Sequence, residues 1–503
     1  MKRSALLLLL SSLLLSSVSC GSAAEPEQPQ KNDAESVQAA QPAETETPGI
    51  PEPDIPEKDY GGADFTYLIR NGNVASYVER YVFSEGEDGE PINDAIYARN
   101  IRVEEKFNIH ICALNPTWQG GWAGELENLA RKYILTNDPG IDVLSSMRST
   151  LGTLLREGYL YNMNELKYVD LTSAWWDANA AETLEFGGKL YLMPNDISMG
   201  NLAMARFIYF NQGIVGEFDL EDPYALVEQN KWTIDKMLEM ASAVSVDVNG
   251  DSVFDHNDKY GMLTDESANG SFVTLVAGAG ITLAAKDEKG MIVPNIMTEK
   301  VQEMITKCST VLKKTDCAVS SEELFKMGDV SGYDNAYDYP RDLFAQGHFL
   351  FYSSGISSME QFRDMQQDFG IVPNPKFNES QEKYYHKIDT YALIFGVPIC
   401  ASDMERVGAV LEYSAWLSHQ TLLPAYYETT VKGKRLRDDK AIEMLDLIKG
   451  SMLYDFSDIY DLGGAQILYN AYNSGNLAST YSKGEKAYQK KIDKLMTDLN
   501  ALE

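Results

Sequence analysis

Alternating apolar and polar positions predict that the folded part of the chain begins as an α/β structure. Phe65, Tyr67 and Ile69 recur at every second position, which is the period of a strand. A helical run then opens at Pro91, and residues 109–113 alternate again. Strand, helix and strand in this order predict a βαβ unit.

The same two patterns continue along the chain and end in a long amphipathic helix. Trp232 and Trp416 fall at helical positions, so both are expected in the core. The further predicted elements are a helix over 126–135, a strand over 141–144, a hairpin with an edge strand over 187–194, a strand over 206–210, a helix over 233–246, strands over 349–352 and 369–373, a helix over 404–419 and a final helix whose apolar stripe covers 488–499.

The first twenty residues have the pattern of a secretory signal. Lys2 and Arg3 precede a leucine-rich stretch, which ends in small residues before Cys20. A membrane anchor is the alternative, but the apolar stretch is interrupted by serines and falls short of the roughly 20 residues that span a bilayer. The residues before Cys20 resemble a bacterial lipobox, although Ser17 stands where that pattern favours leucine. Cys20 is therefore expected to carry lipid and to anchor the protein to the outer face of the cytoplasmic membrane.

Residues 21–59 lack aromatic side chains and are dominated by Pro, Glu, Ala and Gln. Such a composition cannot bury a hydrophobic core, so this segment is expected to be a disordered tether. A flexible chain of this length reaches about 35 Å, which suits a link between a membrane and a folded body.

The size and charge of the chain narrow the functions that it can have. A chain of 503 residues is too long to fold around a single hydrophobic core, so two or more lobes are expected. Its 43 basic against 75 acidic residues give a net charge of −32. Because so acidic a surface repels phosphate groups, nucleic acid is disfavoured as a partner.

Four cysteines follow Cys20, which is too few for a disulfide scaffold. Cys308 and Cys317 are close enough in sequence to form a bridge, and buried free thiols are the commoner alternative. The spacing of Cys112, Cys308, Cys317 and Cys400 does not resemble a zinc site.

Several stretches, taken in their order along the chain, resemble the extracellular solute-binding lipoproteins of bacterial ABC importers, in the sugar-binding group that includes maltose-binding protein. They are GEPINDAIYARNIRVEEKFNIHI (89–111), KWTIDKMLEMASAVSVDVNGDSVFDHNDKYGM (231–262), LFAQGHFLFYSSG (343–355), DFGIVPNPK (368–376) and LLPAYYETTVKGKRLRDD (422–439).

This resemblance implies a class II periplasmic-binding-protein-like fold, in which two α/β lobes are joined by a hinge and hold the ligand in a cleft between them. By analogy, residues 60–195 with 389–432 form the first lobe, and residues 196–388 with 433–503 form the second. The resemblance also implies a monomer that closes on an extracellular carbohydrate and delivers it to a membrane permease.

Carbohydrate recognition needs flat apolar faces and a few fixed hydrogen-bonding groups. Tryptophans in predicted loops can supply the flat apolar faces, and filling of the core is their alternative role. Polar residues that follow predicted strands or lie at crossings between lobes can supply the hydrogen-bonding groups, and helix capping is their alternative role. The candidate ligand-binding residues are Arg70, Asn71, Trp118, Trp122, Arg148, Trp175, Trp176, Asp196, Tyr352, Ser353, Asp389 and Tyr391.

Residues 247–258 have the oxygen spacing of a twelve-residue calcium loop, with an acidic surface turn as the alternative. Ser252 stands where the sharp turn usually has glycine, and the last position is an aspartate rather than the usual glutamate. The predicted ligands of a structural Ca²⁺ are Asp247, Asn249, Asp251, the Val253 carbonyl, Asp255 and Asp258.

Two other functional classes remain as alternatives. A surface glycoside hydrolase would need two paired carboxylates, but any of the 75 acidic residues could supply such a pair, so this signal has almost no specificity. The HExxH, GxSxG, P-loop and GxGxxG motifs are absent, and no catalytic cofactor is expected. A surface glycan-binding or sensor protein without a transport role is the second alternative.

Overall fold

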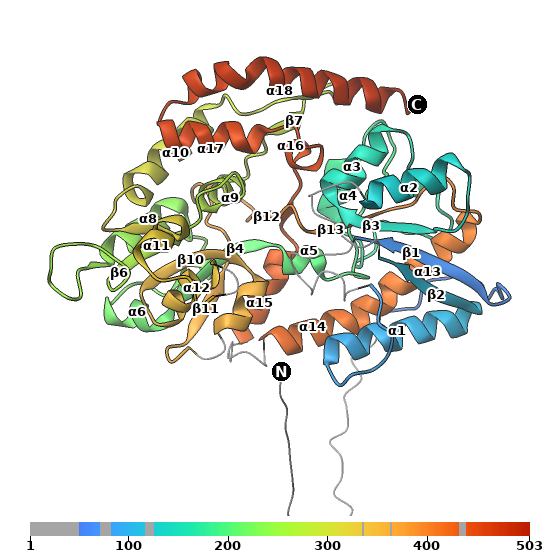
Figure 1. Cartoon of the computed structure of the whole chain (residues 1–503), viewed down its shortest axis with the longest axis horizontal. Coiled ribbons are helices and arrows are strands. Elements are labelled where there is room, and N and C mark those ends of the chain that lie inside the picture. Colours follow the sequence, from blue (N-terminus) through green and yellow to red (C-terminus); the bar gives the residue numbers. More distant parts are fainter. Residues whose placement is uncertain are drawn as a thin grey trace, which may run out of the picture. The chain divides into compact units, whose positions relative to one another are not determined.

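Two separate β-sheets, each covered by helices, organise the part of the chain that the structure describes (Figure 1). The computed structural model describes residues 50–70, 82–115, 125–333, 336–362, 365–431 and 439–502. We call the elements around the four-stranded sheet the first lobe and those around the six-stranded sheet the second lobe. The prediction of an α/β fold is confirmed.

The first-lobe sheet has the strand order β13-β3-β1-β2, in which β1 runs parallel to both β2 and β3. Phe65 pairs with Ile111 and Tyr67 pairs with Val143. The strand β13 pairs antiparallel with β3 at the edge of the sheet. The βαβ unit predicted at the start of the folded part is therefore confirmed.

The helix α1 shows how local sequence positions an element of this lobe. Pro91 opens the helix, and Asn108 ends it in the left-handed conformation, with φ of 47°. The bounds of the elements from the first lobe are β1 Ala63–Ile69, α1 Pro91–Phe107, β2 Ile109–Leu114, α2 Glu125–Leu135, β3 Val143–Met147, α3 Arg148–Arg156, η1 Met163–Glu165, α4 Ala178–Leu184, β13 Leu393–Gly396, α13 Met404–Gln420 and α14 Leu422–Val431.

The second-lobe sheet has the strand order β11-β4-β10-β6-β5, and β9 pairs with β6 beside this path. The helix α8 packs closely on this sheet, because a Cβ at Gly261 would lie 1.9 Å from the carbonyl oxygen of Ala241. The bounds of the elements from the second lobe are β4 Arg206–Asn211, α6 Gln212–Glu217, α7 Pro223–Glu228, α8 Ile234–Ala243, β5 Ser245–Val246, β6 Lys259–Thr264, α9 Ser271–Gly278, β7 Ala284–Lys286, β8 Ile292–Pro294, α10 Glu299–Leu312, β9 Ala318–Ser320, α11 Ser321–Met327, α12 Asp338–Ala345, β10 Phe349–Gly355, η2 Ile356–Phe362 and β11 Phe369–Val372.

Within the residues that the structure describes, three segments connect the two lobes. The first connecting segment, residues 195–205, contains the short helix α5 (Gly200–Ala203) and leads into β4. The second connecting segment, residues 386–392, begins with β12 (His386–Lys387) and leads into β13. The third, residues 450–455, contains β14 (Met452–Leu453), which pairs with β12. A bridge between Ala205 and Ile388 joins the first two segments.

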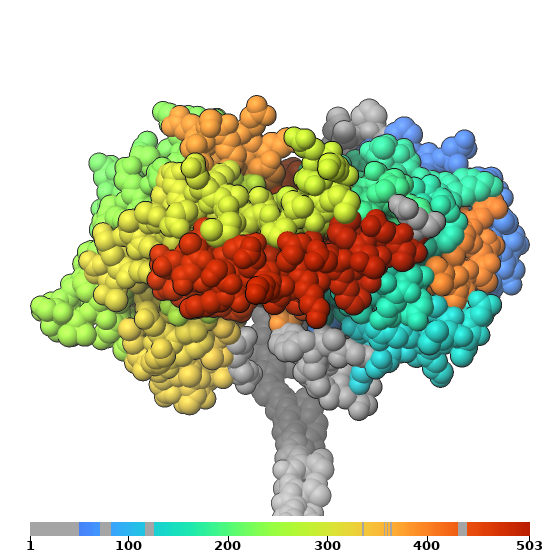
Figure 2. All heavy atoms as spheres, turned by 90° about the horizontal axis from the view of Figure 1, so that it is seen from above, coloured from blue at the N-terminus to red at the C-terminus, as the bar shows by residue number. Residues whose placement is uncertain are grey.

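The C-terminal helices contact both lobes. The helix α15 (Asp439–Lys449) packs near β11 and α16 (Phe456–Ile459) packs on α3, whereas α17 (Gly464–Ser474) packs on α9. The helix α18 (Leu477–Asn500) contacts β8 of the second lobe and α3 of the first. Figure 2 shows the end of the chain, in red, across the front of the view. An ion pair of 2.8 Å between Arg156 and Asp498 fixes the end of α18 to the first lobe.

Two predicted elements differ from the structure. The helix predicted over 233–246 ends at Ala243, because Ser245 and Val246 pair with β6 as the strand β5. Residues 187–194 form the predicted hairpin only as a tight turn, in which Phe186 and Lys189 pair across Gly187 and Gly188, and the predicted edge strand does not follow. Met193 makes a single bridge to Phe395, and Pro194 lacks the N–H that would continue a ladder.

The cysteines after Cys20 are all free thiols in the structure, which confirms the commoner of the two alternatives. Cys308 and Cys317 are both buried and unpaired. Trp232 and Trp416 are buried, as predicted.

Candidate functional site

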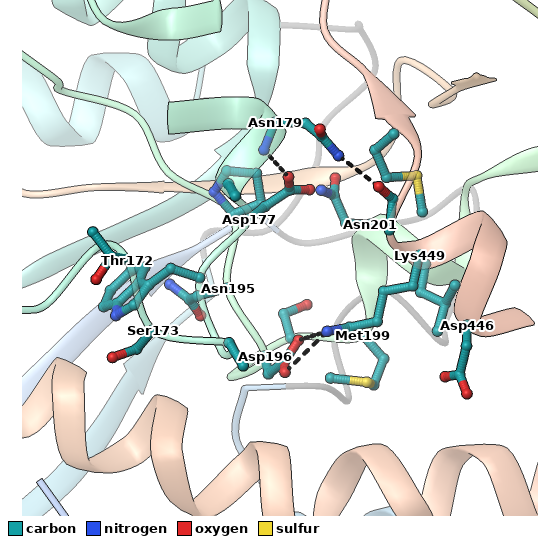
Figure 3. A pocket seen from close by; sticks show the side chains of 18 residues that line it. Thr172, Ser173, Asp177, Asn179, Asn195, Asp196, Met199, Asn201, Asp446 and Lys449 are labelled. Carbon is teal, nitrogen blue, oxygen red and sulfur yellow. Dashed lines mark hydrogen bonds and ion pairs between the residues drawn. The ribbon is translucent and has the colours of Figure 1, made fainter. Parts of the chain in front are cut away.

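A cavity of about 360 Å³ lies where α4, the first connecting segment and the end of α15 meet (Figure 3). Its described lining residues fall within 172–179, 194–202 and 446–452. The three stretches are far apart in sequence, so only the folded chain brings them together. Of the predicted ligand-binding residues, Trp176 and Asp196 line this cavity.

Asp196 is the charged centre of one wall of the cavity. Its carboxylate lies 2.6 Å from Nδ1 of His419 and 3.1 Å from Nζ of Lys449. His419 belongs to α13 of the first lobe, and Lys449 ends α15, which packs near β11 of the second. One carboxylate therefore joins a helix of each lobe to the first connecting segment.

Asp177 contributes a second carboxylate and caps the N-terminus of α4. Its Oδ1 accepts hydrogen bonds from the backbone N–H groups of Asn179 and Ala180 over 3.0 and 3.1 Å. Its Oδ2 accepts from the hydroxyl of Tyr454 over 2.6 Å. Burial raises the pKa of Asp177 above its ordinary value in spite of these bonds.

Two amide side chains that line the cavity each have one polar atom without a partner in the described structure. The Nδ2 of Asn195 is buried and unpaired, whereas its Oδ1 accepts from the N–H of Ile197. The Oδ1 of Asn201 is likewise unpaired, whereas its Nδ2 donates to the hydroxyl of Tyr454 over 2.5 Å. Because buried polar atoms are normally satisfied, this donor and this acceptor each indicate a partner, such as a ligand group or a water.

Trp175 and Trp176 are held by a shared acceptor. The indole N–H groups of Trp175 and Trp176 donate to the two carboxylate oxygens of Glu412 over 3.0 and 2.8 Å. Glu412 lies on α13 and is almost fully buried, and this burial raises its pKa to about 7. Both indoles belong to the core of the first lobe, but Trp176 also lines the cavity.

Other predicted residues gather at the second connecting segment rather than in the cavity. A guanidinium nitrogen of Arg148 donates to the carbonyls of Ile388 and Asp389 over 2.7 and 3.0 Å. The carboxylate of Asp389 lies 3.4 Å from Nε of Arg206. The structure therefore brings Arg148 and Asp389 together between the lobes.

Arg70 and Tyr391 form a contact of their own in the same region. The guanidinium carbon of Arg70 lies 5.9 Å from the ring centroid of Tyr391, which is a cation–π distance. Burial lowers the pKa of Arg70.

Tyr352 and Ser353 lie within β10 and are buried in the second lobe. The Tyr352 ring stacks on Tyr209 with centroids 6.3 Å apart, and Oγ of Ser353 has no partner in the described structure. Neither residue lines the cavity. The remaining predictions, Asn71, Trp118, Trp122 and the lipidation site Cys20, lie outside the described residues.

The sequence reasoning missed several residues that line the cavity. Asp177 and Asn195 lie beside predicted residues, and an aspartate before a helical run is a recognisable N-cap signal. Asn201 and Lys449 carry no comparable signal, because they reach the cavity only through the packing of α5 and α15.

The predicted calcium loop connects the paired strands β5 and β6. Ser252 adopts the left-handed conformation, with φ of 65°, at the position where such loops usually have glycine. The carboxylate of Asp247 accepts from the N–H groups of Gly250 and Ser252, and that of Asp258 accepts from those of Val248 and Asp255. Within the described ranges, no group of three His, Cys, Asp or Glu side chains is placed to hold a metal, so calcium stays a prediction.

Among the described residues, no helix combines the length and the hydropathy that a membrane span requires. The chain matches the family model of the bacterial extracellular solute-binding proteins over residues 122–418, which is more than half of its length. No curated protein sequence is significantly similar to the chain.

Several solved structures resemble the whole described fold. A sugar transporter of Rhizobium etli in an open conformation is 13% identical, with a TM-score of 0.53 over 88% of this chain and 100% of that one. A cyclo/maltodextrin-binding protein complexed with maltotetraose is 14% identical, with a TM-score of 0.51 over 88% and 98%. RafE of Streptococcus pneumoniae is 12% identical, with a TM-score of 0.51 over 88% and 98%. At such identities the likeness shows the fold alone, which is the two-lobed periplasmic-binding-protein-like fold.

Proposed function

Because the chain belongs to the family of bacterial extracellular solute-binding proteins, we propose that the solute it binds is a carbohydrate, held in the cavity beside Trp176 and Asp196. Its relatives in this family bind solutes rather than catalyse reactions, and the family is secreted or associated with the cell surface. The similar structure in complex with maltotetraose supports the choice of a sugar as the ligand class.

The observation that carries the proposal is the combination of an aromatic ring with unpaired polar atoms in one cavity. Trp176 lines the cavity with 4% of its surface exposed, so it offers a small aromatic patch that the C–H face of a sugar ring can contact. The Nδ2 of Asn195 and the Oδ1 of Asn201 offer one donor and one acceptor. A sugar hydroxyl both donates and accepts, so a pair of hydroxyls satisfies both atoms.

We also propose that the protein delivers its ligand to an ABC permease. The Asp196 carboxylate contacts helices of both lobes beside the cavity, so a ligand bound there touches the elements that move when lobes close. Lipid on Cys20 and the part of the predicted tether that precedes Ile50 would hold the protein at the membrane while it captures its ligand. Residues 50–59 belong to the folded body instead of the tether, because Ile55 is buried and the carbonyl of Ile50 accepts a hydrogen bond from the indole N–H of Trp416 over 3.2 Å.

A thermal-shift screen with titration calorimetry tests the binding function. A ligand that binds only the folded state stabilises it by about 2.7 kcal/mol at a hundredfold excess over Kd. We expect neutral oligosaccharides to raise the melting temperature by several degrees, whereas amino acids and peptides leave it unchanged. Chromatography of the recovered sugar serves as the control, because breakdown of the sugar would indicate a hydrolase. A rise with amino acids or peptides alone would overturn the carbohydrate proposal.

Cell fractionation tests the anchor. The wild-type chain is expected in the membrane fraction and the Cys20→Ser variant in the soluble fraction. Equal membrane association of both chains would refute lipidation at Cys20.

A further inference from the structure

The cavity has an excess of negative charge. Of the described residues that line it, Asp177, Asp196 and Asp446 are acidic, and Lys449 alone carries a positive charge. Figure 3 shows Lys449 extended toward Asp196 from the end of α15.

Two basic side chains at the cavity, Lys449 and His419, are engaged by one carboxylate. Nζ of Lys449 lies 3.1 Å from Oδ1 and 3.2 Å from Oδ2 of Asp196. Nδ1 of His419 lies 2.6 Å from Oδ2 of the same residue. An anionic ligand would therefore have to share Lys449 with Asp196.

Asp177 carries a second carboxylate at the cavity, and the cation of Lys449 acts on it only at a distance, because the ion pairs of Lys449 go to Asp196. The hydrogen bonds to its carboxylate come from two backbone N–H groups and the hydroxyl of Tyr454, all of which are neutral donors. A second carboxylate brought into the same partly enclosed space would be repelled, because like charges interact strongly away from bulk water.

The unpaired atoms favour an uncharged ligand for an independent reason. The Oδ1 of Asn201 needs a donor, and the Nδ2 of Asn195, on a side chain only 6% exposed, needs an acceptor. Hydroxyl groups supply both, whereas an ionised carboxylate can only accept. A carboxylate in this position would leave the Asn201 oxygen unsatisfied.

We infer that the cavity selects its ligand by charge: it takes uncharged sugars, rejects their uronic acid counterparts, and uses the Asp177 carboxylate to discriminate between them. This inference rests on the proposed carbohydrate binding and adds to it the class of sugar and the residue that sets the preference.

Matched pairs of sugars test the inference on the intact protein. The probes are oligosaccharides of glucose, galactose and mannose, each compared with the corresponding oligo-uronate by titration calorimetry at pH 7. We expect each oligo-uronate to bind at least about tenfold more weakly than the neutral sugar of its pair.

The variant Asp177→Asn tests the residue. Asparagine caps a helix as well as aspartate does, so the substitution removes the charge while its Oδ1 still accepts from the N–H groups of α4. We expect this variant to bind the uronate several-fold more tightly than the wild type does. The difference in Kd between the neutral sugar and its uronate, which we call the gap, should therefore become smaller. Asp222→Asn is the matched control, because Asp222 caps α7 in the same way outside the cavity, and it should leave the gap unchanged.

The outcomes separate this inference from the function on which it depends. If neutral sugar and uronate bind equally, or the uronate binds more tightly, charge selection is wrong although carbohydrate binding stands. If no sugar of either kind binds, the proposed function itself falls. If the difference in Kd between neutral sugar and uronate is unchanged in Asp177→Asn, Asp177 does not set the charge preference. Should Asp177→Asn unfold at the assay temperature, Asp446→Asn at the exposed edge of the cavity provides the same test of charge.

Discussion

The indole N–H of Trp176 donates a hydrogen bond to the carboxylate of Glu412 over 2.8 Å. The polar edge of the ring is therefore fixed inside the first lobe, while the same side chain lines the cavity. Trp175 makes an equivalent bond to the other oxygen of Glu412 and does not line the cavity. Both tryptophans therefore have a structural role through Glu412, and of the two only Trp176 is also placed to contact a ligand in the cavity.

Replacing each tryptophan by phenylalanine is expected to have different effects on binding. Both variants lose one hydrogen bond to Glu412, so each should lose about 1–3 kcal/mol of stability. Only Trp176→Phe reduces the aromatic surface in the cavity, so it should weaken sugar binding several-fold, as measured by calorimetry. Trp175→Phe is the control and should keep the wild-type Kd. Equal effects of the two variants on Kd would show that Trp176 has no direct role in binding.

The buried Glu412 is expected to make stability depend on pH. Its pKa rises from 4.5 to about 7 on folding, so the folded state holds the proton more tightly than the unfolded state. Protonated Glu412 therefore contributes about 3 kcal/mol to the free energy of unfolding. This contribution is fully present below pH 4.5 and is lost as the pH rises through 7.

Comparison with Glu412→Gln isolates this effect, because glutamine stays neutral at every pH. Urea unfolding at pH 4.5, 6 and 7.5 should show the free energy of unfolding of the wild type falling relative to that of the variant. If the free energies of unfolding of the wild type and the variant changed in parallel over this pH range, the raised pKa of Glu412 would be refuted.

A buried ion pair in the first lobe is expected to show strong coupling. Arg406 donates to Asp142 over 2.7 Å, and the other oxygen of Asp142 accepts from the N–H of Thr66. Arg406→Met leaves this buried carboxylate without its cation and should cost about 3–5 kcal/mol in denaturant unfolding. Adding Asp142→Asn should recover part of the loss, whereas a double variant less stable than the single one would contradict the prediction.

Calcium binding by residues 247–258 remains a separate prediction. Added Ca²⁺ is expected to raise the melting temperature of the wild type, because a metal that binds only the folded loop stabilises it. Asp247→Asn with Asp251→Asn removes two predicted ligands and should abolish the rise. Mg²⁺ at equal concentration is the control, since it demands a smaller octahedral site. An unchanged melting curve in Ca²⁺ would leave the loop as an acidic turn.

The strands and helices could largely be predicted because their periodicity is local. The βαβ unit from 63 to 114, the strand at 206–211 and the helix from 404 all follow from apolar spacing. The helix over 233–246 was predicted too long, because pairing of Ser245 and Val246 with a strand further along the chain ends it. Such a tertiary contact leaves no mark on local periodicity.

The site could be predicted only in part, for a related reason. Residue type and position pointed to Trp176 and Asp196, both of which line the cavity. Arg148 was equally suitable by type, but its guanidinium donates to backbone carbonyls between the lobes. Lys449 reaches Asp196 across more than two hundred and fifty positions of sequence, so no local pattern could indicate the contact.

The strand order of the first lobe has a consequence for folding during synthesis. The edge strand β13 begins at Leu393, long after β3 ends at Met147. Because a chain is synthesised from its N-terminus, the outer edge of β3 stays unpaired until most of the chain has been made. Unpaired edges invite association with other chains, and closing so long a loop is slow. Newly made molecules thus pass through a period in which association with other chains competes with completion of the first sheet.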